Sequence, residues 1–384
     1  MADAFGIYIH WPFCLSKCPY CDFNSHVAAT IEQSAWRGAL LAELEHFAQE
    51  TAGRTVTSIF FGGGTPSLME PATTAALLDA VAKRWRLADD AEITLEANPG
   101  TIDAERFRDF RATGVNRLSM GLQALDDQAL RFLGRRHDLA QAITAVELAR
   151  ATFPRISFDL IYARPGQTID HWREELDWAI ALAADHLSLY QLTIEAGTAF
   201  HTAYARGDFI LPDEDTAAGL FELTQEITAA HGLPAYEISN HARPGAECRH
   251  NLLYWQGDDY VGIGPGAHGR LTDSSGTVWA ISQLKAPETW RKAVAGVGHG
   301  TKERVALGRD ERMAELVMMG LRLNDGLSAI RFALRSGKTL TDAVNRSGLD
   351  MMIGDAFLVW DGDRLRATPK GRLVLNSVIA ALLA

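Results

Sequence analysis

The sequence has few cysteines, and three of its four lie within eight residues. Cys14, Cys18 and Cys21 belong to the stretch HWPFCLSKCPYCDFNSH, whereas Cys248 stands alone much later in the chain. Four thiols in 384 residues are too few for a scaffold built on disulfides. A cluster of thiols in a chain otherwise poor in cysteine indicates metal or redox chemistry.

Positive charge and long apolar runs are also scarce. The net charge is −11, which argues against a nucleic-acid-binding surface over the whole molecule. No uncharged apolar run approaches the ~18 residues that cross a bilayer. The first residues, MADAFGIYIH, lack the basic region of a targeting segment. We therefore expect a cytoplasmic protein with no nucleic-acid partner.

Strand-like runs alternate with amphipathic helical stretches through the first half of the chain. The expected strands are residues 6–11, 58–63, 92–97, 117–121, 156–161 and 186–192, and the expected helices are residues 31–48, 71–86, 103–112, 138–151 and 169–183. Nearly continuous apolar strands are typical of a parallel sheet covered on both faces. The pattern predicts an α/β fold, with parallel strands that are open or curled into a partial (β/α)6 TIM-like barrel.

After about residue 200 the alternation ends. Residues 213–231 are expected to be helical, 236–240 to form a strand and 257–280 to be rich in glycine and turns. From residue 309, helical segments precede two strand-like runs around Asp361-Gly362, a hairpin signal. We predict a partial barrel over residues 1–210, an extension of it over 211–305, and a smaller C-terminal helical, winged-helix-like domain over 306–384.

The cysteine spacing by itself leaves two kinds of metal site open. C-x3-C-x2-C lets one loop hold three corners of a 4Fe–4S cluster and leaves the fourth iron open, which we favour. A structural zinc site would need a fourth ligand, which His10 or His26 could supply. An ordinary buried cysteine does not explain three thiols on one loop.

The stretch FFGGGTP places Gly62, Gly63, Gly64 and Thr65 at the end of the second expected strand. Glycines allow a ligand to approach the backbone closely, although a glycine triplet alone is more often a turn. Together with the cysteine loop one β–α unit upstream, the motif resembles the radical S-adenosylmethionine superfamily. The resemblance implies that S-adenosylmethionine chelates the open iron and that its cleavage yields a 5′-deoxyadenosyl radical.

Polar residues end the other expected strands, where barrel enzymes carry their functional groups. Each alone could be a cap or an ion-pair partner, but together they predict one pocket: Glu96, Gln123, Asp159, Tyr190 and Gln191. A carboxylate there suits the ribose hydroxyls of S-adenosylmethionine. Arg135, in LGRRH, could bind a carboxylate bidentately or lie on a solvated surface.

Motifs along nearly the whole chain resemble the coproporphyrinogen-oxidase-like branch of the superfamily, and within it the heme chaperones. They include YIHWPFC, LEANPGT, LGRRH, FDLIYARPGQT and HNLLYWQGDDYVGIGPGAHG. The resemblance implies that Tyr8, Gly63 and Glu96 lie with the cysteines around the first cofactor. In the oxidase, a second S-adenosylmethionine is bound by the positions that match Tyr20, Gly64, Thr65, Gln123, Arg135, Asp159 and Thr193.

Two departures from the oxidase favour the chaperone. The oxidase has a further cysteine where this chain has Phe23, and it has a long N-terminal extension, whereas 13 residues precede Cys14 here. Without such an extension, a substrate radical would be poorly shielded from side reactions.

The stretch CRHNLLYW matches a motif associated with heme in the chaperones. His250 could supply an imidazole to heme iron, and Tyr254 and Trp255 could stack on the macrocycle. From the residues alone, ordinary loop residues at His250 and Asn251 beside core aromatics would be the favoured explanation of the stretch. His268 and His10 are weaker candidate ligands, and the absence of C-x-x-C-H leaves covalent attachment without support.

We therefore predict a heme chaperone that binds heme, a 4Fe–4S cluster and S-adenosylmethionine, and that transfers heme to an acceptor hemoprotein. The expected acceptors include membrane-associated hemoproteins. The chain is expected to act as a monomer or a homodimer. The alternatives are an oxygen-independent coproporphyrinogen III oxidase or another radical porphyrin-modifying enzyme, and a zinc-stabilised binding module. S-adenosylmethionine cleavage is compatible with this scaffold, whereas coproporphyrinogen decarboxylation is not expected.

Overall fold

One curved sheet organises the larger part of the molecule. The computed structural model describes residues 4–384, so the first three residues of the predicted barrel lie outside the described residues. Neighbouring strands run parallel in the order β10 (Asp259–Ile263), β1 (Phe5–Trp11), β4 (Thr55–Gly63), β5 (Arg86–Ala97), β6 (Arg117–Gln123), β7 (Arg155–Tyr162) and β8 (His186–Gln191). The expected strands of the first half are confirmed, and β10 adds a parallel strand beside β1.

Antiparallel strands extend this sheet at both edges. β11 (His268–Thr272), β12 (Val278–Gln283) and β13 (Thr301–Ala306) follow β10, and β9 (Asn240–Ala242) pairs with β8. The expectation of glycine-rich turns over 257–280 was therefore incomplete, and the strand expected at 236–240 was wrong, because β9 begins at Asn240. Residues 236–239 bend instead, since the Glu237 side chain accepts hydrogen bonds from the backbone N of Ser239 and from the side-chain Nδ2 of Asn240.

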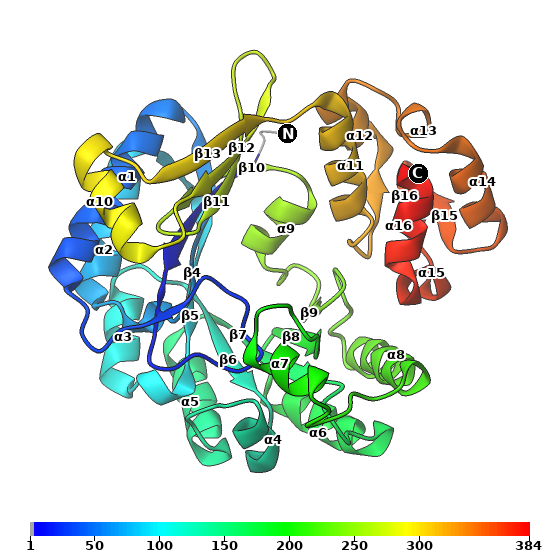
Figure 1. The fold of residues 1–384 in the computed structure, drawn as a ribbon, viewed down its shortest axis with the longest axis horizontal. Helices are drawn as coiled ribbons and strands as arrows, with labels where there is room; N and C mark the ends of the chain where they lie inside the picture. Colours follow the sequence, from blue (N-terminus) through cyan, green and yellow to red (C-terminus); the bar gives the residue numbers. More distant parts are fainter. Residues whose placement is uncertain (1–3) are drawn as a thin grey trace.

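Helices cover the outer side of the curved sheet, as Figure 1 shows. They are α1 (Gln33–Glu50), α2 (Pro71–Arg84), α3 (Ala104–Ala112), α4 (Asp127–Phe132), α5 (Leu139–Thr152) and α6 (Ile169–Leu182). Ile7, Ile9 and Trp11 lie on one face of β1 and are fully buried, and His10 on the other face is also buried, so that strand is covered on both faces. The α/β fold with a partial parallel barrel is thus confirmed; the short α4 was not expected.

The later helices complete the barrel and fill its inner side. α7 (Ala199–Ala205) and α8 (Glu214–Ala230) follow β8, and α10 (Pro287–Val297) packs on α1. α9 (Arg249–Trp255) lies on the inner side of the sheet, against β4, β1 and β10 (Figure 1). The heme-associated motif HNLLYW therefore forms a helix inside the curved sheet rather than a surface loop.

The C-terminal part packs around its own hydrophobic cluster. It comprises α11 (Arg309–Gly320), β14 (Leu327–Ser328), α12 (Ala329–Ser336), α13 (Leu340–Ala343), α14 (Arg346–Gly354), β15 (Leu358–Asp361), β16 (Arg364–Ala367), α15 (Pro369–Leu373) and α16 (Leu375–Leu383). The expected hairpin is β15–β16, and β14 joins it in a three-stranded sheet. The exact domain limits given above stay a prediction. No helix of residues 4–384 has both the length and the apolar character that crossing a membrane requires.

Buried ion pairs fasten the C-terminal part to the end of α9. Arg312 and Arg335 each donate to the Gly257 carbonyl oxygen over 2.6 Å. The Asp258 carboxylate, whose side chain is 1% exposed, pairs with Arg331 and Arg335 of α12. A buried charge is stable only when it is paired, so these contacts require the two parts to stay together.

We expect Asp258→Ala to lower the free energy of unfolding by about 3 kcal/mol, because it removes the buried carboxylate that pairs with Arg331 and with the largely buried Arg335. Asp361→Ala is the matched control, since it breaks an ion pair with Arg366 in which the Asp361 side chain is 65% exposed. The control should cost less than about 1 kcal/mol. Urea unfolding of both variants measures the difference, and equal losses would show that the buried pair does not hold the parts together.

Candidate functional site

The carboxyl ends of the parallel strands open into a cavity of about 330 Å³. It is lined by the cysteine loop, by residues at and after the carboxyl ends of β4, β5 and β6, and by Asp159 of β7. Among them are these predicted site residues: Cys14, Cys18, Cys21, Tyr20, Gly63, Gly64, Thr65, Glu96, Gln123, Arg135 and Asp159. The fold thus brings together side chains that are spread over about 145 positions of the sequence, as parallel strands in a barrel do.

The backbone of the cysteine loop is closed at its base and tied at its tip. β2 (Phe13–Cys14) pairs with β3 (His26–Val27), which brings the two ends of the loop together. The Cys21 amide donates to the Cys18 carbonyl oxygen over 3.1 Å, and the Phe200 amide of α7 donates to the Pro19 carbonyl oxygen over 2.8 Å. The three thiols are therefore held on a defined turn.

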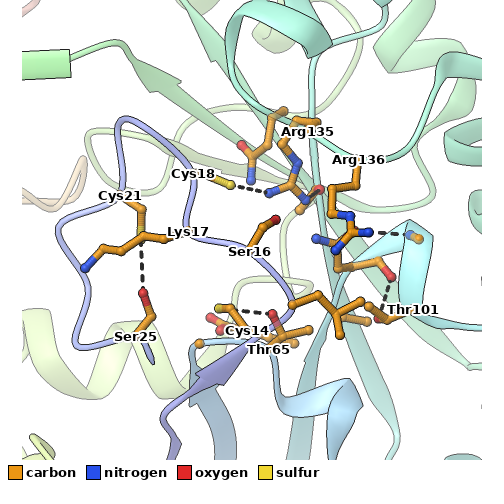
Figure 2. A pocket seen from close by; sticks show the side chains of 18 of the residues that line it. Cys14, Ser16, Lys17, Cys18, Cys21, Ser25, Thr65, Thr101, Arg135 and Arg136 are labelled. Carbon is orange, nitrogen blue, oxygen red and sulfur yellow. Dashed lines mark hydrogen bonds between the residues drawn. The ribbon is translucent and has the colours of Figure 1, made fainter. Parts of the chain in front are cut away.

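Each thiol has a hydrogen-bond partner beside it, and Figure 2 shows all three pairs. Thr65 Oγ1 donates to Cys14 Sγ over 3.3 Å, Arg135 Nη1 donates to Cys18 Sγ over 3.3 Å, and Ser25 Oγ lies 3.9 Å from Cys21 Sγ. Burial raises the pKa of Cys14 and of Cys21, so these two thiols are protonated when no metal is bound. Metal binding deprotonates such a group, and donors at the sulfur then stabilise the thiolate.

The glycine motif packs directly against the start of this loop. The Gly64 amide donates to the Trp11 carbonyl oxygen over 2.7 Å, and the Thr65 amide donates to that of Phe13 over 2.8 Å. A β-carbon at Gly64 would lie 2.7 Å from the Phe13 oxygen, so no larger residue fits without a shift. The glycine thus permits the close approach that places Thr65 on Cys14.

Two half-buried carboxyl groups, those of Glu96 and Asp159, line the cavity. Burial, together with the charge of Asp159, raises the pKa of Glu96 to about 8, and burial raises the pKa of Asp159 to about 6. The Gly63 amide donates to Glu96 Oε2 over 3.2 Å. At neutral pH Asp159 is therefore mostly ionised, whereas Glu96 keeps its proton until a cationic ligand favours its ionisation.

The side chains of Arg135 and Gln123 lie at the cavity wall rather than extending into solvent. Arg135 Nη2 donates to the Gly121 carbonyl oxygen over 2.7 Å, and its buried Nε has no partner among residues 4–384. Gln123 has a φ of 80°, which is unusual for a residue other than glycine and is typical of functional sites. A solvated-surface role for Arg135 is thereby excluded.

Other predicted site residues do not line this cavity: Tyr8, Tyr190, Gln191, Thr193 and His250. The Tyr8 hydroxyl lies 3.0 Å from His10 Nδ1, behind the glycine motif, and Thr193 is exposed beyond the end of β8. His250 is 1% exposed, with Ser58 Oγ 2.8 Å from Nδ1 and the Tyr254 hydroxyl 2.7 Å from Nε2. Burial lowers the pKa of His250 to about 3, so its ring is neutral and both of its nitrogens are engaged.

Asn24 is a positioning residue that the sequence did not reveal. Its Nδ2 donates to the carbonyl oxygens of Pro265 and Lys285, each over 2.9 Å, and its own carbonyl oxygen lies 2.9 Å from His10 Nε2. Gly266, with a φ of 78°, leaves no room for a β-carbon because Asn24 lies against it. The glycines of GIGPGAHG could have indicated such a close approach, but nothing in the sequence shows that the partner is the cysteine loop.

The donor set fits the cluster and cofactor that the sequence led us to expect. Three cysteines on one loop border a cavity that also holds two carboxyl groups and an arginine. Among the described residues, no three His, Cys, Asp or Glu side chains converge closely enough for a single metal ion. A cluster needs no such convergence, because each thiolate then binds a different iron.

Comparisons with known proteins agree with this arrangement. The family model of the radical SAM superfamily matches residues 8–179, and that of the HemN C-terminal domain matches residues 307–374. The heme chaperone HemW of Escherichia coli (strain K12) is 38% identical over 99% of this chain and 98% of its own length. The mitochondrial radical S-adenosyl methionine domain-containing protein 1 of Mus musculus is 40% identical over 98% of this chain and 87% of its own length.

A solved structure shows the same fold. Coproporphyrinogen III oxidase (HemN) from Escherichia coli superposes with a TM-score of 0.81 over 99% of this chain and 90% of its own, at 24% identity. The likeness covers both the partial barrel and the C-terminal part.

We expect Gly266→Ala to reduce the iron and sulfide retained after anaerobic reconstitution by at least half, because the new β-carbon displaces Asn24 and with it the cysteine loop. Gly276→Ala is the matched control, since Gly276 has a φ of 84° but nothing within 4 Å of a β-carbon. Both variants carry the same backbone strain of about 1 kcal/mol. Equal iron contents in the two variants would contradict the role given to Asn24.

Proposed function

Because the chain belongs to the radical S-adenosyl methionine superfamily, in the family of its full-length HemW and mitochondrial relatives, we propose that it is a heme chaperone. It binds heme, carries a 4Fe–4S cluster with S-adenosylmethionine, and transfers heme to an acceptor hemoprotein. One observation carries the proposal: identity of 37–38% with heme chaperones named HemW extends over nearly the whole of this chain.

The residues of the cavity have distinct roles in holding the cofactors. Cys14, Cys18 and Cys21 would bind three irons of the cluster, and Thr65 and Arg135 donate to two of the sulfurs. The reduced cluster supplies the electron that cleaves S-adenosylmethionine in this superfamily. The cavity walls would orient the cofactor and exclude water.

Glu96 is the group we assign to the polar end of S-adenosylmethionine. Its carboxyl group faces the cavity beside the glycine motif and is held uncharged by burial up to about pH 8. The charge of a sulfonium or an amino group nearby favours the carboxylate, so ligand binding and ionisation of Glu96 reinforce each other.

We expect the affinity for S-adenosylmethionine to rise from about pH 6.5 to about pH 8.5, because the carboxylate form of Glu96 binds the cation. Calorimetric titration of the reconstituted protein measures this slope. The ligand's own amino group titrates equally in every variant, so Glu96→Gln isolates the contribution of Glu96 and should flatten the profile. Asp159→Asn removes a neighbouring charge and should move the rise to lower pH. Identical slopes for wild type and Glu96→Gln would refute the assignment.

A chaperone binds and transfers its tetrapyrrole unchanged, whereas an oxidase decarboxylates it. The shared fold with HemN does not choose between them, since 24% identity shows the fold alone. The aromatic residue at Phe23, where the oxidase resembled above has a further cysteine, supports the chaperone.

One anaerobic preparation tests the proposal. We expect the reconstituted protein to bind about one heme per chain, to transfer it to an apo-hemoprotein, and to leave coproporphyrinogen III unchanged in the presence of S-adenosylmethionine and a reductant. Cys18→Ser is the control for the role of the cluster, and 5′-deoxyadenosine is measured in the same samples. Decarboxylation of coproporphyrinogen, or failure of the wild type to bind heme, would overturn the proposal.

The remaining predictions about partners belong to this proposal. A membrane-associated acceptor and a monomeric or homodimeric state stay predictions, and so does the cytoplasmic location, since the relatives include proteins named as mitochondrial. His250 also stays a predicted heme ligand. To bind iron it would have to leave Ser58 or Tyr254.

A further inference from the structure

The heme that the proposed function requires needs a docking surface that is open in the folded protein. We propose that heme docks across the mouth of the cysteine-loop cavity, with a carboxylate on Arg136 and an apolar face on Phe23. This inference rests on the proposed function and adds a site that the heme-associated motif does not predict.

Arg136 is an exposed arginine at the cavity wall with no ion-pair partner among residues 4–384. Its neighbour Arg135 is already engaged by Gly121 and Cys18. Some exposed arginines pair with acids, as Arg206 does with Asp208 and Arg249 with Asp90, whereas others such as Arg108 have no ion pair within the described chain but also no cavity beside them. In a chain with a net charge of −11, an arginine left without an acid beside a cavity is available for an anionic ligand. A guanidinium group matches a carboxylate bidentately.

Lys17 adds a second positive charge to the same cavity from the cysteine loop. Its Nζ donates to the Phe23 carbonyl oxygen over 3.5 Å and has no ion-pair partner in the described part of the chain. Figure 2 shows Lys17 and Arg136 on different sides of the thiols. Positive charge therefore lies on two sides of the cavity mouth, which favours a ligand with negative charge.

The cysteine loop also presents apolar surface at this mouth. Phe23 is 60% exposed and Leu15 is 47% exposed, and both line the cavity. Large apolar side chains exposed at the rim of a pocket are typical of a ligand-binding surface. Apolar side chains and unpaired cations around one opening suit a flat apolar ligand that carries carboxylates. Heme has both properties, whereas a purely polar anion lacks the apolar surface.

The size of the cavity places the macrocycle at its mouth. About 330 Å³ lies at the lower end of the range for small-molecule sites. The cluster and S-adenosylmethionine would take up that space, so a tetrapyrrole would lie across the opening. Binding at α9 would first require His250 to leave Ser58 or Tyr254, because both of its ring nitrogens are engaged and its side chain is buried.

Spectrophotometric heme titration of the anaerobically reconstituted full chain tests the site. We expect Arg136→Glu and Phe23→Asp each to raise the Kd for heme at least tenfold, with iron and sulfide content unchanged. The matched controls are Arg108→Glu, another exposed arginine, and Leu334→Asp, a side chain that is 82% exposed on α12. Both controls should stay within twofold of the wild type. Heme dimethyl ester, which has no free carboxylate, should bind wild type and Arg136→Glu with equal affinity.

The outcomes separate this inference from the proposed function. Wild-type affinity in both Arg136→Glu and Phe23→Asp would overturn the docking site while leaving the chaperone proposal intact. The same holds if His250→Ala alone abolishes heme binding. A wild type that binds no heme would instead overturn the proposed function itself.

Discussion

The hydrogen bonds between the glycine motif after β4 and the chain that leaves β1 hold the whole site in place. They bring Thr65 onto Cys14 and seat the cysteine loop on the carboxyl edge of the sheet. Asn24 adds a second attachment, to the turn between β10 and β11. The position of the thiols therefore depends on the backbones of neighbouring strands, and any change that separates those strands also displaces the cysteine loop. This arrangement explains why glycine is needed where the backbones come closest.

A second group of charged side chains lies inside the barrel, around Glu92. Burial alone would raise the pKa of Glu92, but Arg117 and Arg155 lower it below its ordinary value. The Glu92 carboxylate also accepts from the His250 amide at the start of α9. Since Gly257 and Asp258 at the other end of α9 bind arginines of the C-terminal part, this helix connects the barrel interior to that part. The HNLLYW motif thus has a structural role that is independent of any heme.

The likeness to HemN and the likeness to HemW answer different questions. The first is a likeness of fold alone, and it covers the partial barrel and the C-terminal part. The second extends along the sequence and supports a role in heme handling. The open mouth beside Phe23 and Arg136 is compatible with both, because one scaffold can hold its cofactors inside the cavity and a tetrapyrrole outside it.

The sequence by itself determined the parallel strands, the three-thiol loop and the polar residues at the strand ends, because apolar runs and clustered cysteines are local patterns. It also predicted that Glu96, Gln123 and Asp159 share a pocket, since parallel strands end at one edge. Only the tertiary structure decided that His250 is buried between Ser58 and Tyr254, that Asn24 anchors the cysteine loop, and that Arg136 is left without an acid. These properties depend on which distant residues become neighbours, and the spacing of residues along a chain carries no information about contacts made across 190 or 240 positions.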